Sequence, residues 1–129
     1  MTIEQRMLVY SSILGFAQIM VAATATTKVR GMKWNAGPRD EILPPLTGVP
    51  GRLDRAAQNF KETFPLFIAA VFLVTACNTA SPTTALGAQM FFWARLIYVP
   101  LYAFGVPFVR TLVWGVATVG VILLFCSLI

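Results

Sequence analysis

Charge-free apolar stretches, separated by short polar ones, dominate the sequence. Residues 7–27 form the first stretch and residues 63–94 a longer one. As one straight helix, residues 63–94 would reach about 48 Å at 1.5 Å per residue, whereas roughly 30 Å of hydrocarbon needs only about 20 residues. The polar stretch 78–84 contains Pro82. We therefore expect the long run to divide there into two helices joined by a tight hairpin.

This pattern predicts an all-α membrane protein, a four-transmembrane-helix bundle built from a single domain, residues 1–129. The four expected helices cover residues 4–28, 54–78, 83–105 and 107–128. Residues 29–53 are punctuated by Pro and Gly and are expected to form a cytoplasmic loop. Loops of this length are usually functional or disordered.

Composition agrees with a membrane protein. Of the 129 residues, 57% are hydrophobic and 12% are charged, and the mean hydropathy is +0.74. A soluble domain carries about 25% charged residues, so this chain lacks the polar surface that would cover a water-soluble globule. A soluble enzyme, a disordered tail and a nucleic-acid-binding module are therefore excluded as classes, and no nucleic-acid partner is expected.

The distribution of charge indicates the orientation in the membrane. Lys and Arg concentrate between residues 28 and 62, whereas the hairpin at 78–84 has none. The positive-inside rule places the first loop in the cytoplasm, and both termini and the hairpin on the other side. Glu4 offsets Arg6 before the first apolar stretch, and Lys28 follows it. A signal peptide has the opposite arrangement, so we expect an uncleaved first span.

The two cysteines, Cys77 and Cys126, fall near the non-cytoplasmic ends of the second and fourth helices. They are either small apolar side chains or partners in a disulfide. The chain has no His, which removes Ser–His and Cys–His catalysis and the commonest metal ligand. Two cysteines are too few for a metal site, and no metal is expected.

Polar side chains form a stripe at the start of the second helix. Arg52, Arg55, Asn59 and Glu62 are spaced by three, four and three residues. That spacing places them on one helical face. Such groups normally face a bundle interior or a water-filled cavity. The stripe is either an interfacial collar of ion pairs or part of a binding site.

The third helix repeats this pattern with Arg95, Tyr98 and Tyr102, again on one face. The tyrosines have an alternative interpretation as an aromatic belt at the membrane interface. Arg95 has two alternative interpretations: its side chain snorkels to the membrane interface, or it forms a structural ion pair with Glu62. Arg110, at the start of the fourth helix, is by itself most often a cytoplasmic anchor.

The predicted topology brings seven of these side chains toward the cytoplasmic side of the bundle: Arg52, Arg55, Asn59, Glu62, Tyr98, Tyr102 and Arg110. Together they offer several guanidinium groups, one carboxylate, one amide and two phenols. Arginine binds carboxylates with two parallel hydrogen bonds, and a glutamate can accept from an ammonium group. The set therefore favours a pocket for a small anionic ligand that carries both carboxylates and an amine.

Three segments resemble one known family. Residues 55–67, RAAQNFKETFPLF, resemble the second-helix signature of the membrane-associated proteins in eicosanoid and glutathione metabolism, the family that includes the microsomal glutathione transferases. Residues 94–102, ARLIYVPLY, and 105–110, GVPFVR, are similar to the segments that follow in that family. The loop at residues 39–48 looks more like the bacterial branch than the animal enzymes. The resemblance covers nearly the whole chain.

The resemblance implies a homotrimer that holds glutathione between neighbouring subunits near the cytoplasmic face. The glutathione-binding residues expected from it and from the polar faces are Arg55, Asn59, Glu62, Tyr98, Tyr102, Arg30, Arg52 and Arg95. Arg110 would match the catalytic arginine beside the sulfur, where a cation favours the thiolate. Two departures from the family pattern, Ala57 and Thr63, bear on ligand affinity. Residence in a bacterial inner membrane follows from the same resemblance.

Three functions remain open from the sequence. The first is a glutathione-dependent transferase or peroxidase in detoxification, with glutathione as co-substrate and a lipophilic electrophile drawn from the membrane lipid. The second is a non-catalytic membrane scaffold or accessory subunit that retains the family fold. The third is a small multidrug exporter, for which Glu62 is the only candidate intramembrane carboxylate. Saturable glutathione binding distinguishes the first from the other two.

Overall fold

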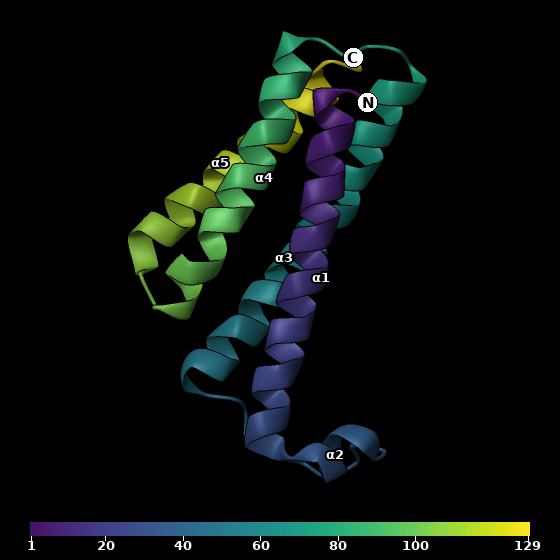
Figure 1. The fold of residues 1–129 in the computed structure, drawn as a ribbon. Helices are drawn as coiled ribbons and strands as arrows, with labels where there is room; N and C mark the ends of the chain where they lie inside the picture. The colour runs from purple at the N-terminus through teal and green to yellow at the C-terminus, as the bar shows by residue number, and fades with distance from the viewer.

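The computed structural model describes residues 1–129, and every regular element in it is a helix. The elements are α1 (Ile3–Arg30), α2 (Met32–Ala36), α3 (Gly48–Ala76), α4 (Pro82–Ala103) and α5 (Pro107–Cys126). Four long helices lie side by side, and the short α2 projects from the far end of α1 (Figure 1). Both termini and the α3–α4 connection share the opposite end of the bundle.

The division of the long apolar run is confirmed, since α3 ends at Ala76 and α4 begins at Pro82. Asn78 adopts a positive φ of 56° in the turn, a conformation that Asn tolerates well. Ser81 then begins α4 with a capping box, because its hydroxyl accepts from the backbone N–H of Thr84 while the Thr84 hydroxyl accepts from that of Ser81. The hairpin therefore has local sequence determinants at both of its ends.

The region predicted as a loop, residues 29–53, is partly helical. Helix α2 occupies Met32–Ala36, and α3 begins at Gly48 rather than at residue 54. Pro50 lies in the first turn of α3, where its missing N–H has no intrahelical partner to lose. Pro and Gly residues in this segment therefore belong in part to the first turn of a helix and not only to a loop.

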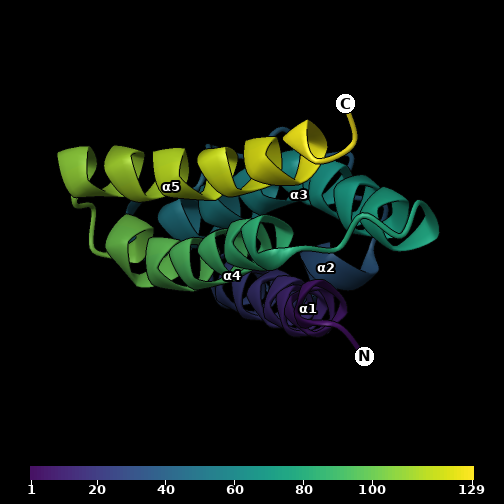
Figure 2. The ribbon, with the colours of Figure 1, turned by 90° about the horizontal axis from the view of Figure 1, so that it is seen from above.

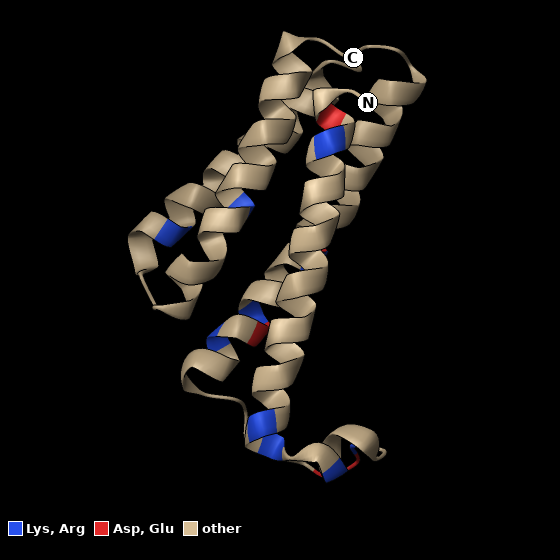
Figure 3. Ribbon diagram, in the orientation of Figure 1, with Lys and Arg blue, Asp and Glu red and all other residues tan.

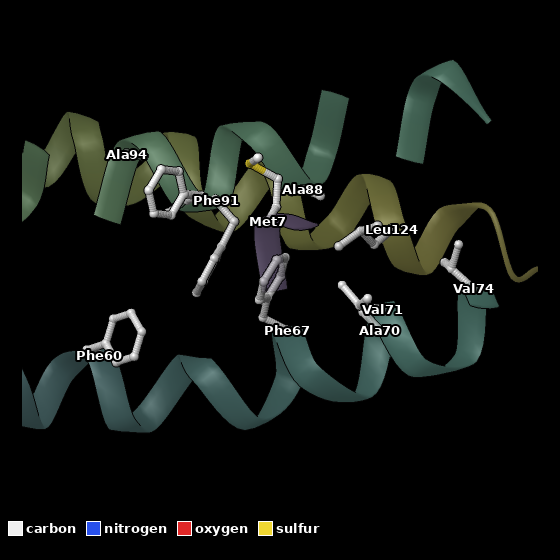
Figure 4. Close-up of a cluster of buried hydrophobic side chains, with 12 residues drawn as sticks. Met7, Phe60, Phe67, Ala70, Val71, Val74, Ala88, Phe91, Ala94 and Leu124 are labelled. Atoms are coloured by element: carbon white, nitrogen blue, oxygen red, sulfur yellow. The ribbon is translucent and has the colours of Figure 1, made fainter. Parts of the chain in front are cut away.

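The hydrophobic core lies where all four long helices meet. Figure 4 shows Phe67 of α3 and Phe91 of α4 near its centre, and their rings stack with centroids 4.0 Å apart. Helices α4 and α5 approach closely through Gly87 and Gly120. A Cβ at Gly87 would lie 2.6 Å from the Gly120 carbonyl oxygen, which no side chain tolerates, so close packing of this pair needs glycine.

Three helices, α1, α3 and α5, are long and apolar enough to cross a membrane. Helix α4 is 22 residues long but has no uninterrupted apolar run of that kind, because it carries Gln89, Arg95 and two tyrosines. It packs against α1, α3 and α5, whereas α1 and α5 do not touch, and Figure 2 shows it between them. The helix that carries the buried Arg95 is thus the one that packs against the other three.

Large apolar side chains cover the outside of the bundle. Phe16, Phe72 and Phe108 are 68%, 67% and 88% exposed. Patches of this kind are unusual on soluble monomers. The surface and the three apolar helices together indicate an integral membrane protein.

Candidate functional site

Two guanidinium groups converge on one phenol where α3, α4 and α5 meet. Arg55 Nε of α3 donates to Tyr102 Oη of α4 at 3.3 Å. Arg110 of α5 lies over the same ring, with its guanidinium carbon 4.5 Å from the centroid, a cation–π geometry. We call these three residues the Tyr102 cluster. Tyr98 meets Tyr102 edge to face at 5.5 Å, so it extends the cluster along α4.

Arg95 is buried deeper along α4 and is only 1% exposed. Its Nη1 donates to Asn59 Oδ1 of α3 at 2.8 Å. Its guanidinium carbon lies 4.6 Å from the ring centroid of Tyr98 and 5.5 Å from that of Phe60. Nε and Nη2 are buried and have no hydrogen-bond partner. This burial rules out snorkelling.

The predicted stripe on α3 is divided among different partners. Arg52 Nε donates to the Ala103 carbonyl oxygen at 3.1 Å and so satisfies one of the last carbonyls of α4. Arg55 donates a hydrogen bond to Tyr102, and Asn59 accepts one from Arg95. These arginines therefore do not form a collar of ion pairs within α3. Glu62, one turn beyond Asn59, is exposed.

The structure does not bring Arg30 to the Tyr102 cluster. Arg30 lies on α1, and its Nη2 donates to the Pro44 carbonyl oxygen at 3.3 Å. It lines a cavity of about 310 Å³ between α1, α2 and α3 together with Asp54, Gln58 and Lys61. These three α3 residues are spaced by four and three, on another face from Arg55. Helix α3 thus presents two polar faces, one toward α4 and one toward α1.

A second arrangement of cations on an aromatic ring lies beside α2. The guanidinium carbons of Arg30 and Arg39 lie 4.8 and 4.7 Å from the ring centroid of Trp34. We call these three residues the Trp34 cluster. Trp34 and Arg39 were not predicted as site residues, because they lie in the segment expected as a loop. The available signal was the concentration of Lys and Arg, which Figure 3 shows in the half of the molecule away from the termini.

A cavity of about 310 Å³ between α3, α4 and α5 was also missed. Its wall is almost entirely apolar, with Arg95 as the only charged residue. Sequence offers little signal for such a space, because it depends on how the helices are placed relative to one another.

A buried carboxylate lies at the other end of the bundle. Glu4 is 3% exposed, and its carboxylate accepts a hydrogen bond from the Thr84 hydroxyl of α4. From the sequence, Glu4 was expected only to offset the charge of Arg6.

Cys77 and Cys126 are exposed free thiols, so they do not form the disulfide that was one of the two alternatives. No group of three or more potential metal ligands comes together.

The helices and their exposed apolar surface define an integral membrane protein with a cationic and aromatic site at one end of its bundle. The MAPEG family matches residues 7–129, and the chain belongs to this family of membrane-associated proteins in eicosanoid and glutathione metabolism. The resemblance of the helix motifs is therefore confirmed. No curated protein and no solved structure matches the chain.

Proposed function

We propose that this protein is a glutathione-dependent membrane transferase or peroxidase that acts on lipophilic electrophiles. The observation that carries the proposal is the Tyr102 cluster, where Arg55 and Arg110 from two helices meet one phenol from a third. Arg55 is exposed and Arg110 is half-buried, so both cations are accessible to a ligand. Membership of the MAPEG family supports glutathione as that ligand.

The residues around the cluster match the functional groups of glutathione. Arg55 is suited to a carboxylate of the tripeptide, and Glu62 to its ammonium group. Asn59 and Tyr98 offer hydrogen bonds, although Asn59 Oδ1 already accepts from Arg95. Arg95 and Arg52 then act by positioning Asn59 and the end of α4, respectively.

Arg110 has the catalytic role in this proposal. A cation beside the sulfur favours the thiolate, which is the nucleophile. In conjugation the thiolate attacks an electrophilic carbon, a C–S bond forms, and the displaced electron pair leaves with the leaving group. In peroxide reduction the sulfur attacks the O–O bond, an alcohol leaves after protonation, and a second glutathione converts the sulfenic acid to glutathione disulfide and water.

The separation of Arg30 from Arg55 favours a site shared between subunits. We propose a homotrimer in which the α1 face of one subunit, with Arg30, lies against the Tyr102 cluster of the next. All four long helices would then cross the membrane, α4 included, since its polar groups are covered by protein. The bacterial inner membrane is the proposed location, with the α2 loop cytoplasmic and both termini on the other side.

The test is glutathione binding to purified protein, followed by the ultraviolet absorbance band of the thiolate. Wild type should give a saturable band. Arg110→Ala should bind glutathione but lose the band, and Arg55→Ala should bind weakly. Arg6→Ala is the matched control, because Arg6 is exposed near the N-terminus, and it should behave as wild type. A folded wild type that binds no glutathione would overturn the proposal in favour of a scaffold.

A further inference from the structure

The outer face of α4 carries two polar groups at membrane depth. Gln89 and Trp93 lie one turn apart on that face. They are about 10 and 16 Å along the helix from its start at Pro82, at 1.5 Å per residue. The proposed crossing of α4 therefore places both inside the roughly 30 Å of hydrocarbon. Trp93 is 54% exposed, yet it lies away from the two interfaces where tryptophan is enriched in membrane proteins.

Neither group has a partner within the chain. Beyond its capping box, α4 makes its side-chain hydrogen bonds through Thr84, Arg95 and Tyr102, which leaves the amide of Gln89 and the indole N–H of Trp93 unpaired. A glutamine amide has two N–H groups and one acceptor oxygen, and the bilayer core has no water to satisfy them. Hydroxyls on α1 and α5 avoid this cost, because they donate to a carbonyl oxygen of their own helix four residues back: Ser12, Thr24, Thr27, Thr111 and Thr118.

A groove of about 410 Å³ runs beside Gln89, between α4 and α5. Its wall is otherwise apolar and includes Leu86 and Met90 of α4 and Val116 of α5. Leu86 is 53% exposed. The buried Arg95, six residues beyond Gln89, lies on a different side of α4. The groove is therefore separate from the proposed glutathione site.

We propose that this face of α4 is an interface between two copies of the chain, in which the two Gln89 amides pair across a two-fold axis along the membrane normal. An amide carries both donors and an acceptor, so two copies of it satisfy one another. Copies inserted in the same direction hold Gln89 at the same depth, and this axis preserves that depth. Hydrogen bonds of this kind between helices stabilise association in membranes. The contact rests on the proposed crossing of α4 but not on glutathione, and it joins one trimer to another, since α1 and the Tyr102 cluster lie elsewhere on the bundle.

Association in bilayers tests the amide pair. Two preparations that carry donor and acceptor fluorophores at the N-terminus are mixed in phosphatidylcholine vesicles at increasing dilution in lipid. Energy transfer between them should rise saturably with protein density. Gln89→Leu removes the amide at nearly constant volume on the outside of the bundle, and association should weaken about tenfold, the size expected for the loss of two hydrogen bonds between helices.

Ser12→Ala is the matched control, because the hydroxyl of Ser12 already donates to the Leu8 carbonyl oxygen of its own helix. This variant should associate as wild type. A wild type that shows no saturable transfer, or a Gln89→Leu variant that associates as strongly as wild type, would overturn the proposal.

Cross-linking locates the contact. Cys77 and Cys126 are first replaced by serine, so that the introduced thiol is the only one. Leu86→Cys lies in the groove, one turn from Gln89, and it should give disulfide-linked pairs of chains when an oxidant is added to the vesicles. Leu112→Cys is the control, because Leu112 is 71% exposed on α5 but lies outside the groove, and it should give few pairs.

Adding Gln89→Leu should lower the yield of Leu86→Cys pairs several-fold and leave that of Leu112→Cys unchanged. Equal yields at the two positions, or a Leu86→Cys yield that Gln89→Leu does not change, would refute this interface. A face covered by lipid or by another protein would give no pairs at Leu86→Cys, and that result also refutes it. The thiolate band of glutathione independently decides the proposed function.

Discussion

The Tyr102 cluster and the Trp34 cluster have the same composition, two guanidinium groups against one aromatic ring, but they differ in what else the cations contact. In the Trp34 cluster, Arg30 donates to the carbonyl oxygen of Pro44, and Arg39 Nη2 donates to that of Asn35 at 3.0 Å. These cations are engaged by nearby backbone and hold the loop in shape.

The Tyr102 cluster is built instead from three helices, and its members are far apart in sequence. Arg55 donates to the hydroxyl of Tyr102, and Arg110 contacts the ring of the same residue. Neither cation satisfies a backbone carbonyl, so most of their N–H groups remain available for a ligand. Arg55 donates one hydrogen bond and Arg110 none, whereas Arg39 makes three contacts with Asn35, so the Tyr102 cluster keeps more N–H groups for the ligand that we propose.

The largest effect should come from removing the ring that the two cations of the Tyr102 cluster share. Tyr102→Ala leaves Arg55 and Arg110 without the surface that positions them, so we expect glutathione affinity to fall by at least about tenfold, the size typical of a lost interaction with a charged group. Isothermal titration of purified protein measures this. Tyr10→Ala, an exposed tyrosine of α1, is the control and should bind as wild type.

Tyr102→Phe sharpens the same comparison. It keeps the ring for Arg110 and removes only the oxygen that accepts from Arg55, so the loss should be a few-fold, in line with one hydrogen bond of about 1 kcal/mol. Equal losses for the alanine and phenylalanine variants would mean that the hydroxyl, and not the ring, positions the cations.

Much of the fold was predictable because apolar runs of spanning length leave few alternatives in a membrane protein. The polar spacing on α3 also correctly placed Arg55 and Asn59 on one helical face, and the structure shows that this face meets α4. The helix start at Gly48 was not predicted, because Pro and Gly are compatible both with a loop and with a first helical turn.

The partners of the polar residues were harder to predict, since they depend on the rotation and depth of packed helices. Nothing local distinguishes Arg52, which holds the end of α4, from Arg55, which joins the Tyr102 cluster. The contact between Glu4 and Thr84 joins residues 80 positions apart, and no pattern in either segment predicts it. Contacts of this kind need the assembled bundle.

Arg52→Ala tests whether the neighbour of the Tyr102 cluster is structural. Its hydrogen bond to Ala103 supports the last turn of α4, so we expect the free energy of unfolding to fall by about 1 kcal/mol with glutathione affinity unchanged per folded protein. Thermal unfolding in detergent, followed by circular dichroism, measures the first quantity. Arg6→Ala is the control. A large loss of glutathione affinity at unchanged stability would show instead that Arg52 belongs to the glutathione site.

The smallest effect should come from the Trp34 cluster. Arg39→Ala removes the donor to Asn35 and one cation over Trp34, but no contact with α3, α4 or α5. Arg39 has a positive φ of 59°, so alanine also leaves that strained backbone without the side-chain contacts that hold it. The loop should therefore be cleaved several-fold faster by a protease that cuts after Trp34, while glutathione affinity stays within about twofold, because a surface substitution costs within roughly 0.5 kcal/mol. If affinity falls instead as far as in Tyr102→Ala, Arg39 itself contributes to glutathione binding, beyond the part proposed for Arg30 in the shared site. The contrast between a cluster that shapes the loop and a cluster that binds would then be wrong.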